Sequence, residues 1–167
     1  MAANAQPVPH RTLKGDLMSS HSSSVQWRRT PHVSDPATYS RNHLALLSGG
    51  QALQVSASVE FKGDEDCADP EQLLVSAVSS CHMLFFLAIA EHQGFTVDRY
   101  DDRPVGFLEK GAKGGPVITR VELSPVVAFS GDKIPDSAAI GRIHAGAHKN
   151  CFIGNSITAD VVINQGA

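Results

Sequence analysis

Residues 69–94 read DPEQLLVSAVSSCHMLFFLAIAEHQG and carry the strongest structural signal in the chain. Asp69 suits a helix N-cap, and Pro70 suits the first helical position. Apolar residues then recur with the period of about 3.6 that an amphipathic helix requires, so we expect a helix from about residue 70 to residue 93 that ends at Gly94. Because its second half is apolar nearly all round, this helix should be buried on several sides, in a core or a subunit interface.

Short strands are predicted on both sides of this helix. Alternating apolar and polar residues indicate strands before it, and Gly49-Gly50 is typical of a hairpin turn. After it, two long strands are joined by a turn rich in glycine, with a proline at its end, at 111–116. The expected strands are 25–27, 42–48, 53–59, 95–110, 117–129 and 157–163, and a second helix is expected at 135–150. This order of elements predicts an α+β fold.

Length, composition and charge narrow the functional classes. The chain has 167 residues and ordinary globular composition, with 42% hydrophobic and 19% charged residues. We expect a disordered tail over 1–24, which lacks a sustained apolar period, and a single domain over 25–167. A formal net charge of −3 does not favour binding to nucleic acid. The longest unbroken apolar run has eight residues, whereas a membrane span needs about 20, so we predict no membrane span.

The three cysteines point to a reducing compartment. An odd number of cysteines without an export signal argues against a disulfide scaffold, and we therefore predict a cytoplasmic protein. Cys81, in the middle of the first helix, is either a small buried hydrophobe or a reactive thiolate. Cys151, just after the second helix, is either a packing residue or a mobile thiol suited to resolving a sulfenic acid. Cys67 lies among acidic residues that should raise its pKa, so we expect it to be dispensable.

Two further groups of residues have alternative interpretations. Glu71 lies ten residues before Cys81, which is roughly 15 Å along one helix, so it cannot touch Cys81 of its own chain. It either complements the helix dipole or acts across an interface between two copies. His144, His148 and Cys151 have a spacing that can hold zinc, but the chain has no second tight ligand pair, and we predict no metal site.

Four passages of the sequence resemble the OsmC/Ohr family of organic hydroperoxide reductases, as a divergent subgroup. They are YSRNH at 39–43, DPEQLLVSAVSSCHML at 69–84, FSGDK at 129–133 and HKNCFIGNS at 148–156, and the resemblance covers roughly residues 39–163. It implies an OsmC-like α+β fold in which antiparallel sheets surround a long central helix. It also implies an intertwined homodimer with its active sites at the subunit interface.

The resemblance also implies roles for individual residues. Cys81 matches the peroxidatic cysteine, and Cys151 matches the cysteine that resolves it. Glu71 and Arg41 match the glutamate and the arginine that activate the thiolate and guide the peroxide. The alternative arginines are Arg28 and Arg29.

Together these residues predict a thiol-dependent peroxidase that reduces organic hydroperoxides to alcohols through a Cys81 sulfenic acid and a Cys81–Cys151 disulfide. No cofactor is expected, and an external dithiol similar to dihydrolipoamide would reduce the disulfide. Met83, Phe85 and Phe86 either wall an apolar pocket that favours organic peroxides or belong to the core. The alternative function is an oxidation-sensing or small-ligand-binding dimer with little turnover.

Overall fold

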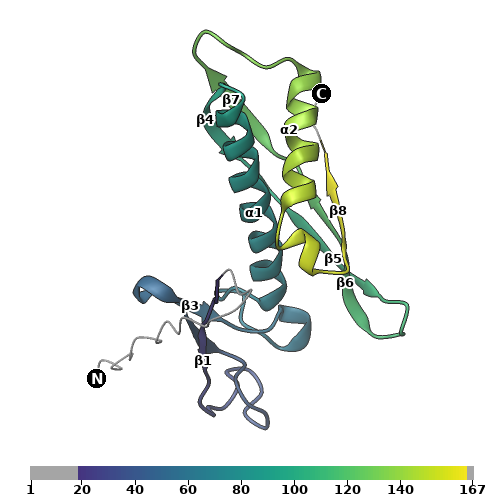
Figure 1. Cartoon of the computed structure of the whole chain (residues 1–167). Coiled ribbons are helices and arrows are strands. Elements are labelled where there is room, and N and C mark those ends of the chain that lie inside the picture. Colours follow the sequence, from purple (N-terminus) through teal and green to yellow (C-terminus); the bar gives the residue numbers. More distant parts are fainter. Residues whose placement is uncertain (1–18, 165–167) are drawn as a thin grey trace. The chain divides into compact units, whose positions relative to one another are not determined.

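A computed structural model of the chain describes residues 19–164 and divides it into two compact units, Met1–Pro70 and Glu71–Ala167 (Figure 1). Residues 1–18 of the predicted tail lie outside the described residues, and the first strand begins at Ser24. The prediction of a single domain stays a prediction.

The first unit is built on a three-stranded antiparallel sheet in the order β1-β2-β3. Its strands are β1 (Ser24–Gln26), β2 (His43–Leu46) and β3 (Ala52–Val55). The predicted turn between β2 and β3 is present as a 3-10 turn, η1 (Ser48–Gly50), in which both glycines have a φ of 75°. The third strand is shorter than predicted, because the chain leaves the sheet after Val55 and forms a second 3-10 turn, η2 (Val59–Phe61).

The long helix α1 (Pro70–His92) confirms the strongest sequence prediction. It is followed by Gly94, which takes a φ of 77° that a residue with a side chain would rarely adopt. By length and composition alone α1 is able to cross a membrane, but the core helix of a soluble protein meets the same criterion. The absence of a membrane span therefore stays a prediction.

The second unit contains a long hairpin that is interrupted in the middle. Each of the two long strands predicted from the sequence is divided: β4 (Thr96–Asp101) and β5 (Val105–Lys110) precede the turn, and β6 (Pro116–Leu123) and β7 (Val126–Ser130) follow it. β5 pairs with β6 and β4 pairs with β7. The breaks contain Pro104 and Pro125, which lack the N–H that a continuous ladder needs.

The second helix and the last strand complete this unit. α2 (Ser137–Asn150) begins after Asp136, whose carboxylate accepts a hydrogen bond of 2.7 Å from the Ala139 N–H as an N-cap. β8 (Asp160–Ile163) pairs with β6 in parallel, whereas the sequence led us to expect antiparallel sheets throughout. The fold is therefore α+β, with antiparallel pairing everywhere else among the described strands.

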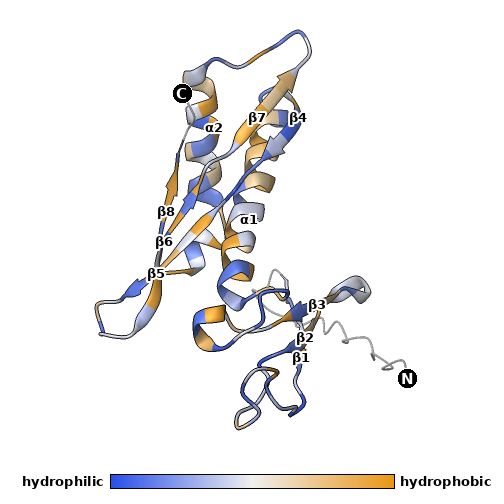
Figure 2. Cartoon of the chain, turned by 180° about the vertical axis from the view of Figure 1, so that it is seen from behind, coloured by the Kyte–Doolittle hydropathy of each residue, from blue (hydrophilic) through white to orange (hydrophobic). Residues whose placement is uncertain are grey.

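The core of the second unit lies between its helices and its sheets. Both views show α1 and α2 side by side along the strands of this unit (Figures 1 and 2). One cluster of buried residues joins α1 to β6, and another joins α1 to α2. The members of the first are Val75, Val78, Val121 and Leu123, and those of the second are Phe86, Ala90, Ile143 and Ala147. The second cluster fixes the two helices that carry Cys81 and Cys151.

Candidate functional site

The two cysteines of the predicted redox pair meet between α1 and the end of α2. Cys81 is half-buried in the middle of α1, and Cys151 is the buried C-cap residue of α2. The two thiols lie close enough together for Cys81 to affect the ionisation of Cys151. The Cys151 thiol also donates to the Val78 carbonyl at 3.9 Å. All three cysteines of the chain are free, so the structure shows the reduced state.

The surroundings of Cys151 both hinder and help its ionisation. Burial raises the pKa of Cys151, and the neighbouring Cys81 raises this pKa further. The backbone N–H of Gly154 donates to Cys151 Sγ at 3.2 Å and lowers the same pKa. A Cβ at residue 154 would lie 3.3 Å from Sγ, so glycine allows this close approach. The chain after α2 thus provides a donor for a Cys151 thiolate.

A buried pair of histidines lies next to the cysteines, and the sequence analysis did not predict it. His82 follows Cys81 on α1 and is completely buried, and His144 on α2 is 2% exposed. Nε2 of His82 lies 3.0 Å from Nδ1 of His144, so one ring donates a hydrogen bond to the other. His82 lies on the same helix face as Val78 and Phe86, which are four residues before and after it. A histidine at such a core position needs a hydrogen-bond partner, and this was the sequence signal for the pair.

Both imidazoles are neutral at pH 7. The pKa of His82 is lowered to about 4, mainly by burial and also by the nearby His144 and His148, while Asp102 opposes the shift. Burial also lowers the pKa of His144, against the opposing effect of Asp102. A neutral pair has one donor and one acceptor for the shared bond. Nδ1 of His82 has no hydrogen-bond partner within the described part of the chain.

A second polar contact ties α1 to the interruption of the long hairpin. Ser79 Oγ donates to one carboxylate oxygen of Asp102 at 2.5 Å, and the other oxygen accepts from the Ser124 N–H at 2.7 Å. The Asp102 charge contributes to the raised pKa of the buried Tyr100 hydroxyl, after burial itself. Asp102 thereby links α1 to the two chain segments at which the strands are interrupted.

The other predicted residues of α1 fall into two groups. Glu71 lies in the first turn of the same continuous helix as Cys81, so it does not reach Cys81 of its own chain. Phe86 is completely buried against Tyr100, Phe129 and His144, which agrees with the core interpretation. Met83 and Phe85 are half-buried, and their role as pocket walls stays a prediction.

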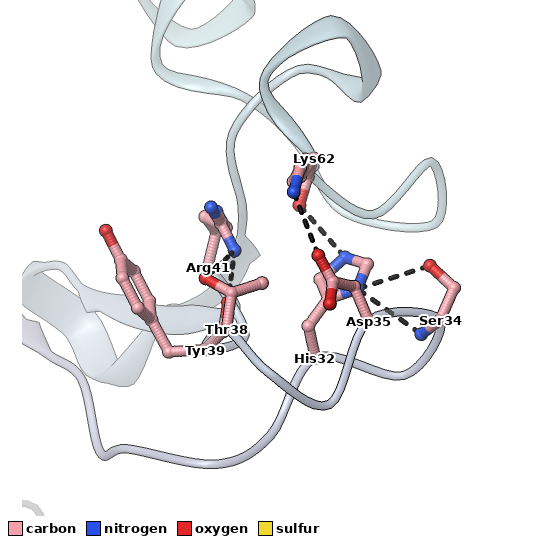
Figure 3. Close-up of polar contacts among 7 residues, drawn as sticks. All are labelled: His32, Ser34, Asp35, Thr38, Tyr39, Arg41 and Lys62. Carbon is pink, nitrogen blue, oxygen red and sulfur yellow. Dashed lines mark hydrogen bonds and ion pairs between the residues drawn. The ribbon is translucent and has the colours of Figure 1, made fainter.

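Arg41 belongs to the first unit, just before β2 (Figure 3). Its guanidinium carbon lies 4.5 Å from the centre of the Tyr39 ring, and its Nη1 donates to the Tyr39 carbonyl and to Thr38 Oγ1. Arg41, Tyr39 and Trp27 line an open cavity of about 430 Å³ in this unit. The cavity is completed by His43, Ser56, Ala57 and Pro70.

The remaining arginines and charged groups of the first unit are more exposed. Arg28 and Arg29 are exposed side chains after β1. Lys62 pairs with Asp35 at 2.9 Å and lowers the pKa of that carboxyl group, and both side chains are largely in solvent (Figure 3). The choice among the three arginines for the activating role stays a prediction.

The two histidines with a spacing that can hold zinc have different surroundings. His144 is buried against His82, whereas His148 is exposed. Within residues 19–164, no group of three or more His, Cys, Asp or Glu side chains is arranged to hold a metal ion. Burial raises the pKa of Cys67, and Asp64 and Asp66 raise it further, as the acidic segment predicted.

Comparison with known proteins identifies the family. The model of the OsmC-like protein family matches residues 63–165, which include Cys81, Cys151 and Glu71 but not Arg41. The chain belongs to this family. A comparison with curated proteins finds no match. The resemblance that the sequence motifs indicated is therefore confirmed at the level of the family.

Solved structures of the family agree with the fold. An OsmC-like protein of unknown function from Vibrio cholerae is 40% identical, with a TM-score of 0.83 over 89% of this chain and all of the other. An organic hydroperoxide resistance protein from Legionella pneumophila is 15% identical, with a TM-score of 0.66 over 91% of this chain and all of the other. The organic hydroperoxide resistance protein OhrB of Bacillus subtilis is also 15% identical, with a TM-score of 0.62 over 90% of this chain and all of the other. These last two likenesses show the fold.

Proposed function

We propose that this OsmC-like protein is a thiol-dependent peroxidase that reduces organic hydroperoxides to alcohols. The observation that carries the proposal is the pair of neighbouring free thiols: Cys81 lies on α1, and Cys151 at the end of α2 reaches the Val78 carbonyl of α1. Two proteins of the same fold are described as organic hydroperoxide resistance proteins, which agrees with this chemistry.

In the first step, the Cys81 thiolate attacks the distal oxygen of the hydroperoxide. The O–O bond breaks, Cys81 becomes a sulfenic acid, and the alkoxide takes up a proton and leaves as an alcohol. Cys81 is half-buried and therefore accessible to a small substrate. Arg41 would stabilise the developing charge, and Glu71 would hold the arginine by a charge-assisted pair.

In the second step, the Cys151 sulfur attacks the Cys81 sulfenic acid. A disulfide forms and water leaves with the hydroxyl of the sulfenic acid and the proton of the thiol. Because burial raises the pKa of Cys151, the hydrogen bond from the Gly154 N–H is needed to support the attacking thiolate. An external dithiol then reduces the disulfide and is itself oxidised to a disulfide, which returns both cysteines to thiols.

We also propose that the protein works as a cytoplasmic homodimer. The exposed side of α1 includes Leu84, whose side chain is 60% exposed in a single chain. Glu71 cannot reach Cys81 of its own helix, so a glutamate beside this thiolate would have to come from a second copy. Light scattering coupled to gel filtration should give the mass of a dimer at micromolar concentration, and a monomer mass would refute this assembly.

The experiment that tests the peroxidase is a turnover assay with purified protein. Cumene hydroperoxide, tert-butyl hydroperoxide and hydrogen peroxide are supplied in parallel, with dihydrolipoamide or dithiothreitol as the reductant. Many turnovers with the organic peroxides, abolished in Cys81→Ser, are expected. Undiminished turnover in Cys81→Ser would refute the mechanism.

One observation favours a second function, that of an oxidation sensor with little turnover. Burial raises the pKa of Cys151, so its thiolate is scarce at neutral pH and the resolving step is slowed. A sensor would consume one equivalent of peroxide and then stop in the same assay, whereas a peroxidase would continue.

A further inference from the structure

The proposed mechanism leaves the buried His82–His144 pair without a role. The two rings are nearly parallel, with an interplanar angle of 10°, and Nε2 of His82 lies 3.0 Å from Nδ1 of His144. Elsewhere this contact between α1 and α2 is apolar, through Phe86, Ala90 and residues of α2. A polar bond inside an apolar helix contact calls for an explanation.

The position of the histidine pair relative to the cysteines suggests an explanation for this bond. His82 is the residue after Cys81, and His144 lies seven residues, or two helical turns, before Cys151. Cys151 reaches the Val78 carbonyl, one turn before His82 on α1. The imidazole bond and the thiol contact are therefore neighbouring connections between the same two chain segments.

The chemistry of a disulfide makes such a connection useful. A disulfide requires Cβ atoms about 3.8 Å apart and a narrow range of torsion angles. Apolar contacts between helices are not directional, so they tolerate small rotations and slides. A hydrogen bond between two ring nitrogens depends strongly on distance and angle. It restrains the rotation of α1 at the residue next to Cys81.

The energetic cost of burying the His82–His144 pair supports a specific role for it. Nδ1 of His82 is buried without a hydrogen-bond partner among the described residues, which is unfavourable for folding. Two apolar side chains of similar shape would fill the same space without that cost. A pair kept for stability alone would not need the unpaired nitrogen.

We propose that His82 and His144 are positioning residues that hold α1 and α2 in the register required for the Cys81–Cys151 disulfide. This inference rests on the proposed function for its biological meaning, because it concerns the disulfide that resolves the sulfenic acid. It predicts that loss of the imidazole hydrogen bond makes the disulfide less stable relative to the two thiols.

The test is the equilibrium between the cysteine pair and dithiothreitol at pH 7, measured in a Cys67→Ser background. The two thiols pass two electrons and two protons to oxidised dithiothreitol, which gives the protein disulfide and reduced dithiothreitol. This readout needs no peroxide. The fraction of disulfide is measured by mass spectrometry after free thiols are alkylated, over a series of reduced-to-oxidised ratios.

The variants differ in hydrogen bonding and hardly in shape. Asn places its amide near the position of the histidine Nδ1, and Leu has nearly the shape of Asn without polar atoms. His144→Leu should lower the equilibrium constant for disulfide formation at least tenfold, which is about 30 mV. His144→Asn should stay within about threefold of the reference protein, or about 15 mV. His82→Met and His82→Gln form a second matched pair, because Gln places its amide near Nε2, and they are measured if His144→Leu does not fold.

A control variant separates positioning from lost stability. Phe95→Leu reduces the packing of the same helices at the far end of α1, and it should leave the equilibrium constant unchanged. Equal constants for His144→Leu and His144→Asn would overturn the inference, and so would the absence of any Cys81–Cys151 disulfide in the reference protein. If the disulfide forms but peroxide is not turned over, the proposed function fails and the constants still decide this inference.

Discussion

Acid should destabilise the second unit through His82, because the folded protein resists the protonation of this imidazole. The pKa of His82 falls from an ordinary value of 6.5 to about 4 on burial. In the unfolded chain the ring takes up a proton as the pH falls below 6.5, while the folded ring stays neutral until about pH 4. The unfolded state therefore binds more protons in this window, and stability decreases as the pH falls through it.

The magnitude follows from the two pKa values. Between pH 7 and pH 5 the unfolded imidazole becomes almost fully protonated and the folded one stays mostly neutral, so His82 costs about 2 kcal/mol of unfolding free energy. Below about pH 4, the imidazole of His82 becomes protonated in the folded protein as well as in the unfolded chain. The loss of unfolding free energy then reaches about 3 kcal/mol and no longer changes with pH. Because the ring is completely buried, solvent does not screen this effect.

The assay is urea denaturation at pH 7, 6 and 5 and at constant protein concentration, followed by far-ultraviolet circular dichroism. This signal reports α1 and α2, whereas fluorescence of the single tryptophan, Trp27, reports the first unit. His82→Gln keeps an amide near Nε2 and cannot be protonated. The loss of stability between pH 7 and pH 5 should be smaller in this variant by about 2 kcal/mol. An equal loss in both proteins would show that His82 is not the group whose protonation destabilises the fold.

Three further substitutions have expected outcomes. Cys151→Ser should leave a sulfenic acid on Cys81 after one equivalent of cumene hydroperoxide, and the lack of a dimedone adduct in the mass spectrum would count against Cys151 as the resolving thiol. Cys67→Ser should not change turnover at neutral pH, because burial and two acidic neighbours keep this thiol protonated, and a severalfold loss of kcat would contradict that role. Gly63→Ala should destabilise the first unit by about 3 kcal/mol, since its Cβ would overlap the Ala57 carbonyl oxygen, and an unchanged urea midpoint by Trp27 fluorescence would show that this contact is relieved.

The helices were predictable from the sequence because their signals are local. α1 begins at Pro70 and is followed by Gly94, and α2 begins after the N-cap Asp136, as the residue types indicated. Pro104 and Pro125 were also a local signal for the interruption of the long hairpin. The parallel pairing of β8 with β6 depends on contacts between distant segments, so no local pattern reveals it.

The candidate site was predictable in part. The motifs around Cys81 and Cys151 indicated the pair through their resemblance to a family, and the structure places the two thiols together. The His82–His144 bond joins residues 62 positions apart, and neither histidine has a motif of its own. His82 stood out only as a polar residue at a core position of α1, and its partner became evident once α1 and α2 were packed together.

In the proposed reaction, Cys81 and Cys151 form a disulfide in response to an organic hydroperoxide. Reduced protein is treated with one equivalent of cumene hydroperoxide, alkylated at its free thiols, digested and mapped by mass spectrometry. A Cys81–Cys151 linked peptide and an alkylated Cys67 are expected. A disulfide that includes Cys67, or three alkylated cysteines with the peroxide left unconsumed, would contradict the proposed reaction.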